Sequence, residues 1–299
     1  MNTPNSLTLK RLAQKAKHYS YIGIKKSNHL SAAAGNVLLD RYFHALEPLT
    51  DYRFDPSRYR RSFILREDHT HMVSPENIPA EVPRVAYAFW TGNNPLTPNR
   101  AKNIDAMEEI LGVPVKLITP DNLDEFLVEG FPLHPSYEKL SLVHRSDYLR
   151  AYLAAYKGGM YVDVKRPKGN VAGLFAQFDQ NPQLWFLGTK HHHNMDVAHM
   201  SGKLGWDLKK FHQRIPANGH FIARAATPMA LEWMREVNRL LDYFAPQLET
   251  FPGNVVGDVV GYPISWNRLL NQVHHPLCLK YLEHTQVTDE LGYPEQQYR

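Results

Sequence analysis

The sequence contains almost no cysteine and no long hydrophobic run. Cys278 is the single cysteine among 299 residues, so no disulfide can form within the chain, and the composition fits a reducing compartment. No early apolar run reaches the roughly 7–15 residues of a signal-peptide core. None approaches the roughly 20 residues of a membrane-spanning helix. These absences predict a soluble, cytoplasmic protein.

The net charge of +4 is distributed unevenly along the chain. Residues 1–80 contain 12 Lys/Arg and 7 Asp/Glu, whereas residues 81–299 contain 22 and 23. The larger part therefore has no excess of basic residues, and we expect no binding of nucleic acid. The first 30 residues carry six basic groups and no acidic group, namely Lys10, Arg11, Lys15, Lys17, Lys25 and Lys26.

This basic N-terminal arm has two interpretations. It can be a solvated helix or a frayed end, because runs of charge usually lie on solvated faces. Alternatively, the leucines and alanines between the charges can attach it peripherally to anionic lipid at the inner face of the membrane, or to a partner. We divide the chain into a basic, helical to irregular arm over residues 1–80 and a larger domain over residues 81–299.

The domain opens with an alternation of strands and helices. Residues 82–90, VPRVAYAFW, predict a buried strand, and the turn-forming TGNNP follows them. Thr97 and Pro98 predict the start of a helix that Gly112 ends. A second strand is predicted over residues 113–119. The expected fold is α/β, with a Rossmann-type, mainly parallel sheet and helices on both faces.

A helix over residues 141–157 precedes the most informative stretch. Gly158 and Gly159 end this helix and allow a tight turn into a strand. Side chains of a strand alternate between its two faces. One face of this strand carries apolar residues, Met160, Val162 and Val164. The other face carries Tyr161, Asp163 and Lys165.

Polar groups collect near the end of this strand, where open parallel sheets bind their ligands. Asp163 and Trp90 follow strands, and Asp147 and Arg150 lie three residues apart on the preceding helix. Carboxylates accept hydrogen bonds from sugar hydroxyls, cations neutralise a diphosphate, and an aromatic ring stacks on a base. Such a set suits a sugar nucleotide. The alternative for Asp147 and Arg150 is an ordinary surface pair worth about 0.3–0.5 kcal/mol.

The motif over residues 146–165 resembles that of glycosyltransferases whose sugar-binding region contains an Asp-x-Asp motif, including the family 32 enzymes and the capsular polysaccharide synthesis proteins. Their pattern is Ser-Asp-x-x-Arg followed by Gly-Gly-x-Tyr-x-Asp-x-Asp. The matching positions are Ser146, Asp147, Arg150, Gly158, Gly159, Tyr161 and Asp163, with Lys165 where the family has its second Asp. A looser match to a strand reading Pro-Lys-x-x-His-x-x-Trp covers Pro83, Arg84, Tyr87 and Trp90.

The resemblance implies a GT-A fold and a hexosyltransferase of the retaining type. Such an enzyme transfers sugar from a nucleotide-diphosphate sugar to a saccharide acceptor, such as a capsule or other surface polysaccharide. The donor-binding positions implied are Trp90, Asp147, Arg150, Gly158, Gly159, Tyr161, Asp163 and Lys165, with Arg150, Asp163 and Lys165 as the catalytic ones. Positions on the acceptor side or in a loop over the donor are Asn218, His220, Asp258 and Tyr262. The alternative is a catalytically inactive sugar-nucleotide-binding or scaffold protein.

Lys165 departs from the Asp-x-Asp motif, and this difference determines which cofactor we expect. The family's second Asp ligates Mn²⁺ or Mg²⁺, which bridges the diphosphate. A lysine cannot do this, but its ammonium can neutralise a phosphate directly. We therefore expect that no metal is required, with Mn²⁺ or Mg²⁺ as the alternative.

A histidine-rich stretch and the C-terminal elements complete the expectations. Residues 190–200, KHHHNMDVAHM, do not match a strict zinc spacing. They predict a polar loop on the acceptor side, with a zinc hydrolase as the alternative. Residues 183–188 and 219–225 predict strands, and Thr227 predicts the cap of a helix. Residues 263–273 predict the last helix, and residues 276–282 the last strand.

Overall fold

The computed structural model describes residues 36–66 and 73–293. The chain forms two compact units, residues 1–50 and 51–299. In the smaller unit, residues 36–46 are helical and the short 3₁₀ helix η1 (Glu47–Leu49) follows. The basic groups of residues 1–30, and the membrane contact predicted from them, lie outside the described residues. Among the helices of the described residues, none combines the length and apolar character needed to cross a bilayer.

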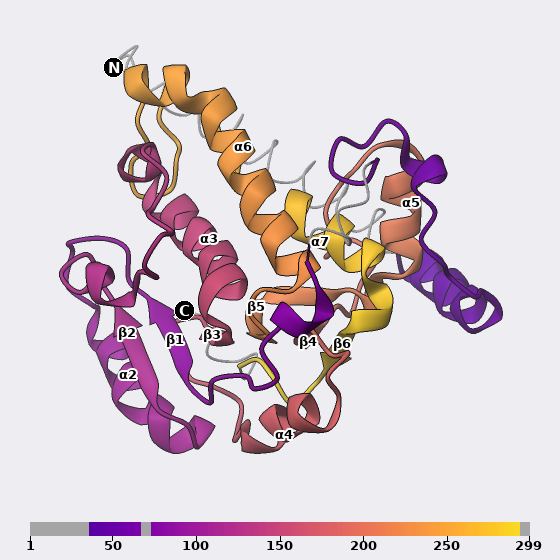
Figure 1. The fold of residues 1–299 in the computed structure, drawn as a ribbon. Coiled ribbons are helices and arrows are strands. Elements are labelled where there is room, and N and C mark those ends of the chain that lie inside the picture. The colour runs from indigo at the N-terminus through magenta and orange to yellow at the C-terminus, as the bar shows by residue number, and fades with distance from the viewer. Residues whose placement is uncertain (1–35, 67–72, 294–299) are drawn as a thin grey trace, which may run out of the picture. The chain divides into compact units, whose positions relative to one another are not determined.

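The larger unit is an α/β domain built on a six-stranded sheet of order β2-β1-β3-β5-β4-β6 (Figure 1). Its strands are β1 (Ala86–Phe89), β2 (Val115–Ile118), β3 (Gly159–Val162), β4 (Phe186–Lys190), β5 (Pro216–Ala223) and β6 (Thr285–Thr288). Neighbouring strands are parallel except where β5 pairs with β3 and with β4. The predicted mainly parallel sheet is confirmed, with β5 reversed in its interior.

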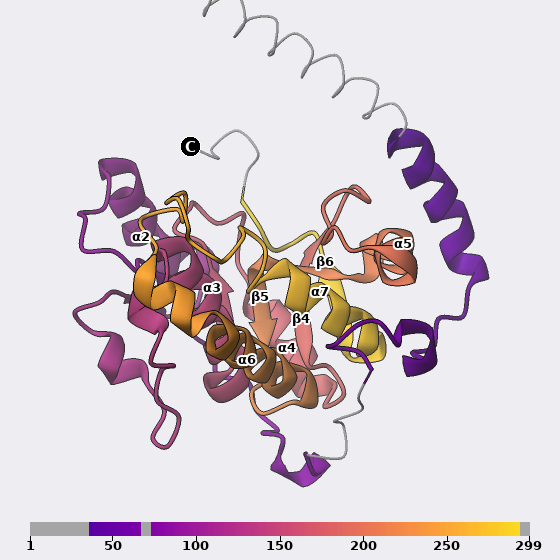
Figure 2. The same cartoon turned by 90° about the horizontal axis from the view of Figure 1, so that it is seen from above.

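Helices pack on both faces of this sheet, as the sequence predicts (Figure 2). The helices are α2 (Pro98–Leu111), α3 (Leu142–Tyr152), α4 (Ala172–Gln180), α5 (Gly202–Lys210), α6 (Pro228–Thr250) and α7 (Asn271–Lys280). The short 3₁₀ helices are η2 (Pro56–Tyr59), η4 (Pro75–Asn77), η5 (Leu123–Phe126), η6 (Tyr137–Lys139), η8 (His212–Arg214) and η9 (Leu282–His284). One core contains Met107 of α2 and Phe175 of α4. The other contains Leu149 of α3, Trp233 of α6 and Leu277 of α7.

The alternation predicted for β3 places two kinds of side chain on opposite faces. Met160 and Val162 belong to the core under α2 and α4, together with Val164 just beyond the strand. Tyr161 belongs to the opposite core. Asp163 follows the last residue of β3, so its carboxylate lies at the C-terminal end of the strand.

The glycine pair at the other end of β3 allows close packing of three chain segments. Helix α3 continues into a π-helical turn, η7 (Leu153–Lys157), which ends at Gly158. Gly158 (φ 69°) and Gly159 (φ 96°) both adopt left-handed conformations. A Cβ atom at Gly159 would lie 3.1 Å from the carbonyl oxygen of Val85, and one at Gly158 would lie 3.1 Å from that of Ala223. The pair therefore brings β3 against the segment before β1 and the end of β5.

Residues 51–66, which the sequence assigned to the arm, pack within the larger unit. Tyr59 and Leu65 are buried. The Tyr59 hydroxyl donates a hydrogen bond to Asp207 Oδ2 (2.8 Å), and Arg58 Nη2 lies 3.0 Å from the same oxygen. By contacts, residues 51–66 thus belong to the same compact unit as the strands of the sheet.

The C-terminal elements differ from those predicted. Residues 263–270 form loop and turns, and α7 begins only at Asn271. The segment 276–282 belongs mainly to α7 and not to a strand, and the last strand is β6. Cys278 lies in α7 and is buried. The run around Cys278 is buried on all sides, so the periodicity that identifies an amphipathic helix is missing from it.

Replacing Thr227 by Ala should destabilise the domain by about 1 kcal/mol, because α6 would lose its N-cap. The Thr227 hydroxyl oxygen accepts a hydrogen bond from the Ala230 amide at 3.3 Å. Thr97 is a matched control, because it is the N-cap residue of α2 and its exposed side chain makes no capping bond. Urea unfolding of both Ala variants measures the difference. Equal losses at Thr97 and Thr227 would contradict the capping role.

Candidate functional site

A cavity of about 410 Å³ lies at the C-terminal ends of β1 and β3. Its walls come from the segment after β1, from α3, from the end of β3 and from the loop over residues 251–270. Five of the residues expected to bind a donor line it together: Trp90, Arg150, Tyr161, Asp163 and Lys165. We call this the β1/β3 cavity.

The Asp163 carboxylate lies between two cations in this cavity. Lys165 Nζ donates to Asp163 Oδ2 at 2.9 Å. The Tyr161 hydroxyl donates to Oδ1 at 2.8 Å, and Arg150 Nη2 lies 3.4 Å from the same oxygen. Burial opposes ionisation of Asp163, but Arg150, then His220 and Lys165, outweigh it and lower the pKa of Asp163 to about 2. The carboxylate is therefore ionised at neutral pH, and both of its oxygens are engaged.

Arg150 connects two carboxylates and an aromatic ring. Its Nη2 donates to the Tyr161 hydroxyl at 2.9 Å, and its guanidinium lies 4.5 Å from the centre of the Tyr161 ring. Its Nη1 lies 3.5 Å from Asp147 Oδ1. Asp147 is buried and does not line the cavity, so it supports Arg150 from within the protein. Burial raises the pKa of Asp147 to about 7, with Arg150 opposing the shift and Asp163 adding to it.

Lys165 is held by groups on two sides. Burial alone would lower the pKa of its ammonium, and the charge of Asp163 more than compensates, so the pKa is raised. The ammonium also lies 4.2 Å from the centre of the Tyr293 ring. Three residues further along the chain, the Lys168 amide donates to the Gly292 carbonyl at 2.9 Å. This hydrogen bond holds Gly292 and Tyr293 beside Lys165. Lys165 therefore remains a cation in a fixed position.

Two tryptophans supply the aromatic surface of the cavity. Trp90 Nε1 donates to the Asn94 carbonyl at 2.7 Å, and the Arg100 guanidinium lies 5.5 Å from the Trp90 ring. Trp266 lines the cavity from the 251–270 loop, and 58% of its surface is exposed. Sequence reasoning missed Trp266 because it assigned the segment to a helix. The sequence feature that could have identified Trp266 as a site residue is a tryptophan among polar and turn-forming residues.

The remaining predicted positions do not line the cavity. Gly158 and Gly159 lie at the opposite end of β3 from Asp163, where the chain segments pack closely. Asn218 Nδ2 donates to Asn271 Oδ1 at 2.9 Å. His220 pairs with Val162 in the sheet and is buried, which lowers its pKa to about 4.

Tyr262 and Asp258 belong to the 251–270 loop, which Tyr262 attaches to the start of α3. The Ser141 amide donates to the Tyr262 hydroxyl at 3.1 Å, and the ring stacks on His144 with centroids 5.6 Å apart. Asp258 is exposed and accepts from Asn254 Nδ2 at 2.6 Å. Tyr262 thus positions the loop that carries Trp266.

The groups around Asp163 do not fit a divalent cation. A metal ion at Asp163 would have to approach or displace Arg150 and Lys165, the two cations that already contact its carboxylate oxygens, together with the Tyr161 hydroxyl. The Lys165 ammonium, whose Nζ lies 2.9 Å from Asp163 Oδ2, would repel a metal ion. Throughout residues 36–66 and 73–293, no three His, Cys, Asp or Glu side chains converge where they could hold a metal.

The histidines of residues 190–200 separate into buried and exposed ones. His191 is buried, and its ring centre lies 4.9 Å from that of His275 in α7. His192 and His193 are exposed, and Asp196 Oδ2 accepts from the His193 amide at 2.9 Å. Burial lowers the pKa of His191 to about 4, with His212 and His192 adding to the shift and Asp196 opposing it. His191 therefore belongs to the core of the domain.

Replacing His191 by Gln should make stability less sensitive to acid. An unfolded histidine titrates near pH 6.5, so between pH 6.5 and about 4 the unfolded chain binds a proton that folded His191 does not. Stability then falls as the pH falls through this window, by about 1.4 kcal/mol per pH unit for each such group. Urea unfolding at a series of pH values should give a shallower slope in the variant, with exposed His192→Gln as control. Unchanged slopes would contradict the depressed pKa.

Comparison with known proteins does not assign a family to the chain. No protein-family model matches the sequence, and no curated protein is significantly similar to it. A function must therefore be inferred from the side chains that line the β1/β3 cavity.

Proposed function

We propose that the chain is a glycosyltransferase that moves a sugar from a nucleotide-diphosphate sugar to a saccharide acceptor, such as a surface polysaccharide. One observation carries the proposal: Asp163, Lys165 and Arg150 form a charged cluster at the end of β3, inside a cavity with tryptophans on its walls. The volume of about 410 Å³ lies within the range of small-molecule sites, about 300–1,000 Å³. The proposal also draws on the resemblance of residues 146–165 to known sugar transferases.

Each part of the donor has a matching group in the β1/β3 cavity. Trp90 and Trp266 offer aromatic faces for the base. An ammonium has three N–H donors, so Lys165 can keep its bond to Asp163 and donate to a phosphate as well. Asp163 accepts hydrogen bonds from sugar or ribose hydroxyls once the donor displaces part of its internal network. In this arrangement Asp147 orients Arg150 and does not contact the donor.

The chemistry assigned to these groups is stabilisation of the leaving group. The bond between the anomeric carbon and the diphosphate oxygen breaks, and negative charge grows on the diphosphate. Lys165 and Arg150 are positioned to neutralise this charge without a metal. Asp163 is a poor general base, because its pKa of about 2 lies far below neutrality. The proton of the acceptor hydroxyl therefore passes to the departing phosphate oxygen, and the hydroxyl oxygen bonds to the anomeric carbon.

A screen of nucleotide sugars tests donor binding. UDP-, GDP- and dTDP-sugars carry a diphosphate, whereas CMP-sugars carry a monophosphate and serve as the comparison. A donor at 100 times its Kd should stabilise the protein by about 2.7 kcal/mol, which a thermal shift detects. Stabilisation by one diphosphate donor and not by the CMP-sugar is the expected result. No stabilisation by any of them would contradict the proposal.

A catalytically inactive sugar-nucleotide-binding protein is the second candidate. The observation that favours it is the closed network in which both oxygens of Asp163 are already engaged. Release of nucleoside diphosphate from the stabilising donor distinguishes the two candidates. A transferase releases it with a saccharide acceptor or slowly with water, whereas an inactive binder gives stabilisation without release.

A further inference from the structure

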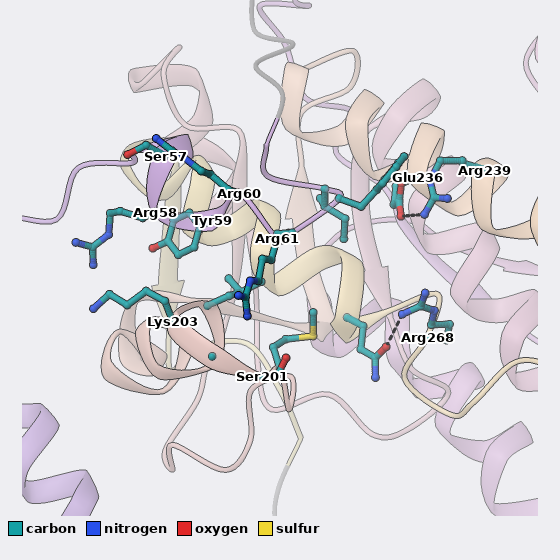
Figure 3. Close-up of a pocket in the computed structure, with 17 residues that line it drawn as sticks. Ser57, Arg58, Tyr59, Arg60, Arg61, Ser201, Lys203, Glu236, Arg239 and Arg268 are labelled. Carbon is teal, nitrogen blue, oxygen red and sulfur yellow. Dashed lines mark hydrogen bonds and ion pairs between the residues drawn. The ribbon is translucent and has the colours of Figure 1, made fainter.

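A second cavity, of about 620 Å³, lies between the segment over residues 57–64, the start of α5, the side of α6 and the turn before α7 (Figure 3). None of its lining residues lines the β1/β3 cavity. We call it the arginine cavity after its commonest side chain. No motif recognised in the sequence accounts for it.

The arginine cavity is strongly basic. Six lining residues carry a positive charge, namely Arg58, Arg60, Arg61, Lys203, Arg239 and Arg268. The carboxylates near them in the described part of the chain are those of Glu236, in the lining, Asp207, which contacts Arg58 and Lys203, and Asp55, whose charge interacts with Arg58 and Arg60. Among the described residues, six cations against three carboxylates leave a balance of three positive charges. A concentration of one sign of charge in a concave surface attracts ligands of the opposite sign.

Internal pairing accounts for only some of these cations. Asp207 lies 3.0 Å from Arg58 and 3.3 Å from Lys203, and Glu236 binds Arg239 through both oxygens. Arg268 donates to the uncharged Gln272 at 3.1 Å. In the described part of the chain, no carboxylate lies within ion-pair distance of Arg60, Arg61 or Arg268. Among the described residues, these three guanidinium groups therefore make no ion pair that an anionic ligand would have to displace.

The start of α5 adds backbone donors to the same cavity. The first amides of a helix have no acceptor within the helix, and they bind anions. The N-cap residue of this helix, Ser201, makes no capping hydrogen bond with its side chain. Gly202 has open space where a Cβ atom would be. Figure 3 shows Arg61 extending from the segment after η2 toward Ser201, so a guanidinium and the helix start point at the same space.

We propose that the arginine cavity binds a phosphate group, either free or as a phosphate ester of a small molecule such as a sugar. A phosphate ester carries a charge of about −1.5 to −2 at neutral pH and three strong acceptor oxygens, whereas a carboxylate carries one charge and two oxygens. Several arginine forks and a helix start can engage a phosphate together. This inference does not depend on the function proposed for the β1/β3 cavity.

One turn connects the two cavities. The Arg268 amide donates to the Ser265 carbonyl at 2.8 Å, which closes a turn that contains Trp266. Trp266 lines the β1/β3 cavity, and Arg268 lines the arginine cavity. A phosphate bound to Arg268 therefore acts on the turn that presents Trp266. The tryptophan fluorescence of the protein gives a second readout of binding.

Titration calorimetry on the full-length chain tests the proposal. The probes are glucose 6-phosphate, inorganic phosphate, glucuronate and glucose, all at one ionic strength. The test variants are Arg61→Gln and a double variant that combines Arg61→Gln with Arg268→Gln. Arg53→Gln is the control, because Arg53 is exposed and lies outside the lining. Lys165→Ala identifies any phosphate that binds in the β1/β3 cavity instead.

Saturable binding of glucose 6-phosphate or inorganic phosphate is the expected result, with weaker binding of glucuronate and none of glucose. The Kd should rise about tenfold or more, or about 1.4 kcal/mol, in the double variant, because the phosphate loses charge-assisted hydrogen bonds from two guanidinium groups. It should stay unchanged in Arg53→Gln and Lys165→Ala. A comparison of the Kd values for glucose 6-phosphate and inorganic phosphate shows whether the sugar part of the ester contributes to the affinity.

Three results would overturn the proposal. The first is no saturable binding of either phosphate probe. The second is loss of binding in Lys165→Ala with retention in the double variant, which would place the phosphate in the other cavity. The third is equal affinity for glucuronate, which would make the site a general anion site. If the double variant unfolds, Arg61→Gln alone decides, because Arg61 is exposed and a change there leaves the core intact.

Discussion

Replacing Asp163 by Asn is expected to reduce sugar transfer at least about a hundredfold while leaving the fold intact. The amide has nearly the shape of the carboxylate but carries no charge, and its NH₂ group would face a cation. Lys165 Nζ (2.9 Å) and Arg150 Nη2 (3.4 Å) would both lose their anionic partner. Breaking a largely buried ion pair by removing one member typically costs about 3–5 kcal/mol, and here the loss falls on the groups that position the donor.

A matched control for this variant lies on the surface of the same domain. Asp179 pairs with Arg84 at 2.6 Å, with both side chains well exposed, and it does not line the β1/β3 cavity. Asp179→Asn should therefore keep its activity. Rates of transfer and thermal midpoints for both variants make the comparison. Activity of Asp163→Asn within about twofold of wild type, or about 0.4 kcal/mol in barrier, would remove Asp163 from the site.

Replacing Lys165 by Ala should lower transfer by about 10²–10³, the usual effect of losing one electrostatic partner of a developing charge. Transfer by the wild-type protein should also survive EDTA, because the ammonium takes the place of a metal ion. Lys165→Asp introduces the second acid of the Asp-x-Asp motif that this stretch resembles, and any activity of the variant should require added Mn²⁺. Lys168→Ala is the control, since Lys168 Nζ is exposed and donates to the Asp289 carbonyl.

One series of assays distinguishes this role from a purely structural one. Wild type, Lys165→Ala, Lys165→Asp and Lys168→Ala are each measured with EDTA and with Mn²⁺. If Lys165 only holds Asp163 in place, its replacement by Ala changes turnover little. Wild-type activity that disappears in EDTA and returns with Mn²⁺ would show that a metal is used, contrary to the arrangement of donors around Asp163.

The sequence predicts the half of the sheet around Asp163 well, because each element there carries its own local signal. The strand at β1, the helix between Pro98 and Gly112 and the alternation along β3 all follow from caps, glycines and periodicity. These signals bring Trp90, Arg150 and Asp163 to one edge of the sheet. The identity of a ligand does not follow from them.

Elsewhere the local signals are weak or misleading. The residues around Cys278 form a short apolar run that follows Pro276, a pattern typical of a strand. In the structure they continue helix α7. The reversed direction of β5 depends on pairing with β3 and β4, which no local pattern encodes. The arginine cavity assembles Arg61, Lys203 and Arg268 from distant parts of the chain, so only the folded arrangement shows that their charges meet.

The position of β5 also determines when the two parts of the sheet can join during synthesis. Strands β1, β2 and β3 pair with one another and end at Val162, so they can associate early. Strand β4 has hydrogen-bonded neighbours only in β5 and β6, both of which come later in the chain. The two parts of the sheet therefore stay separate until Ala223 has left the ribosome, because β5 is the only link between them. Asp163 is synthesised 60 residues before that link is complete, and a nascent chain that stalls in this interval exposes the edge of β3 to other strands.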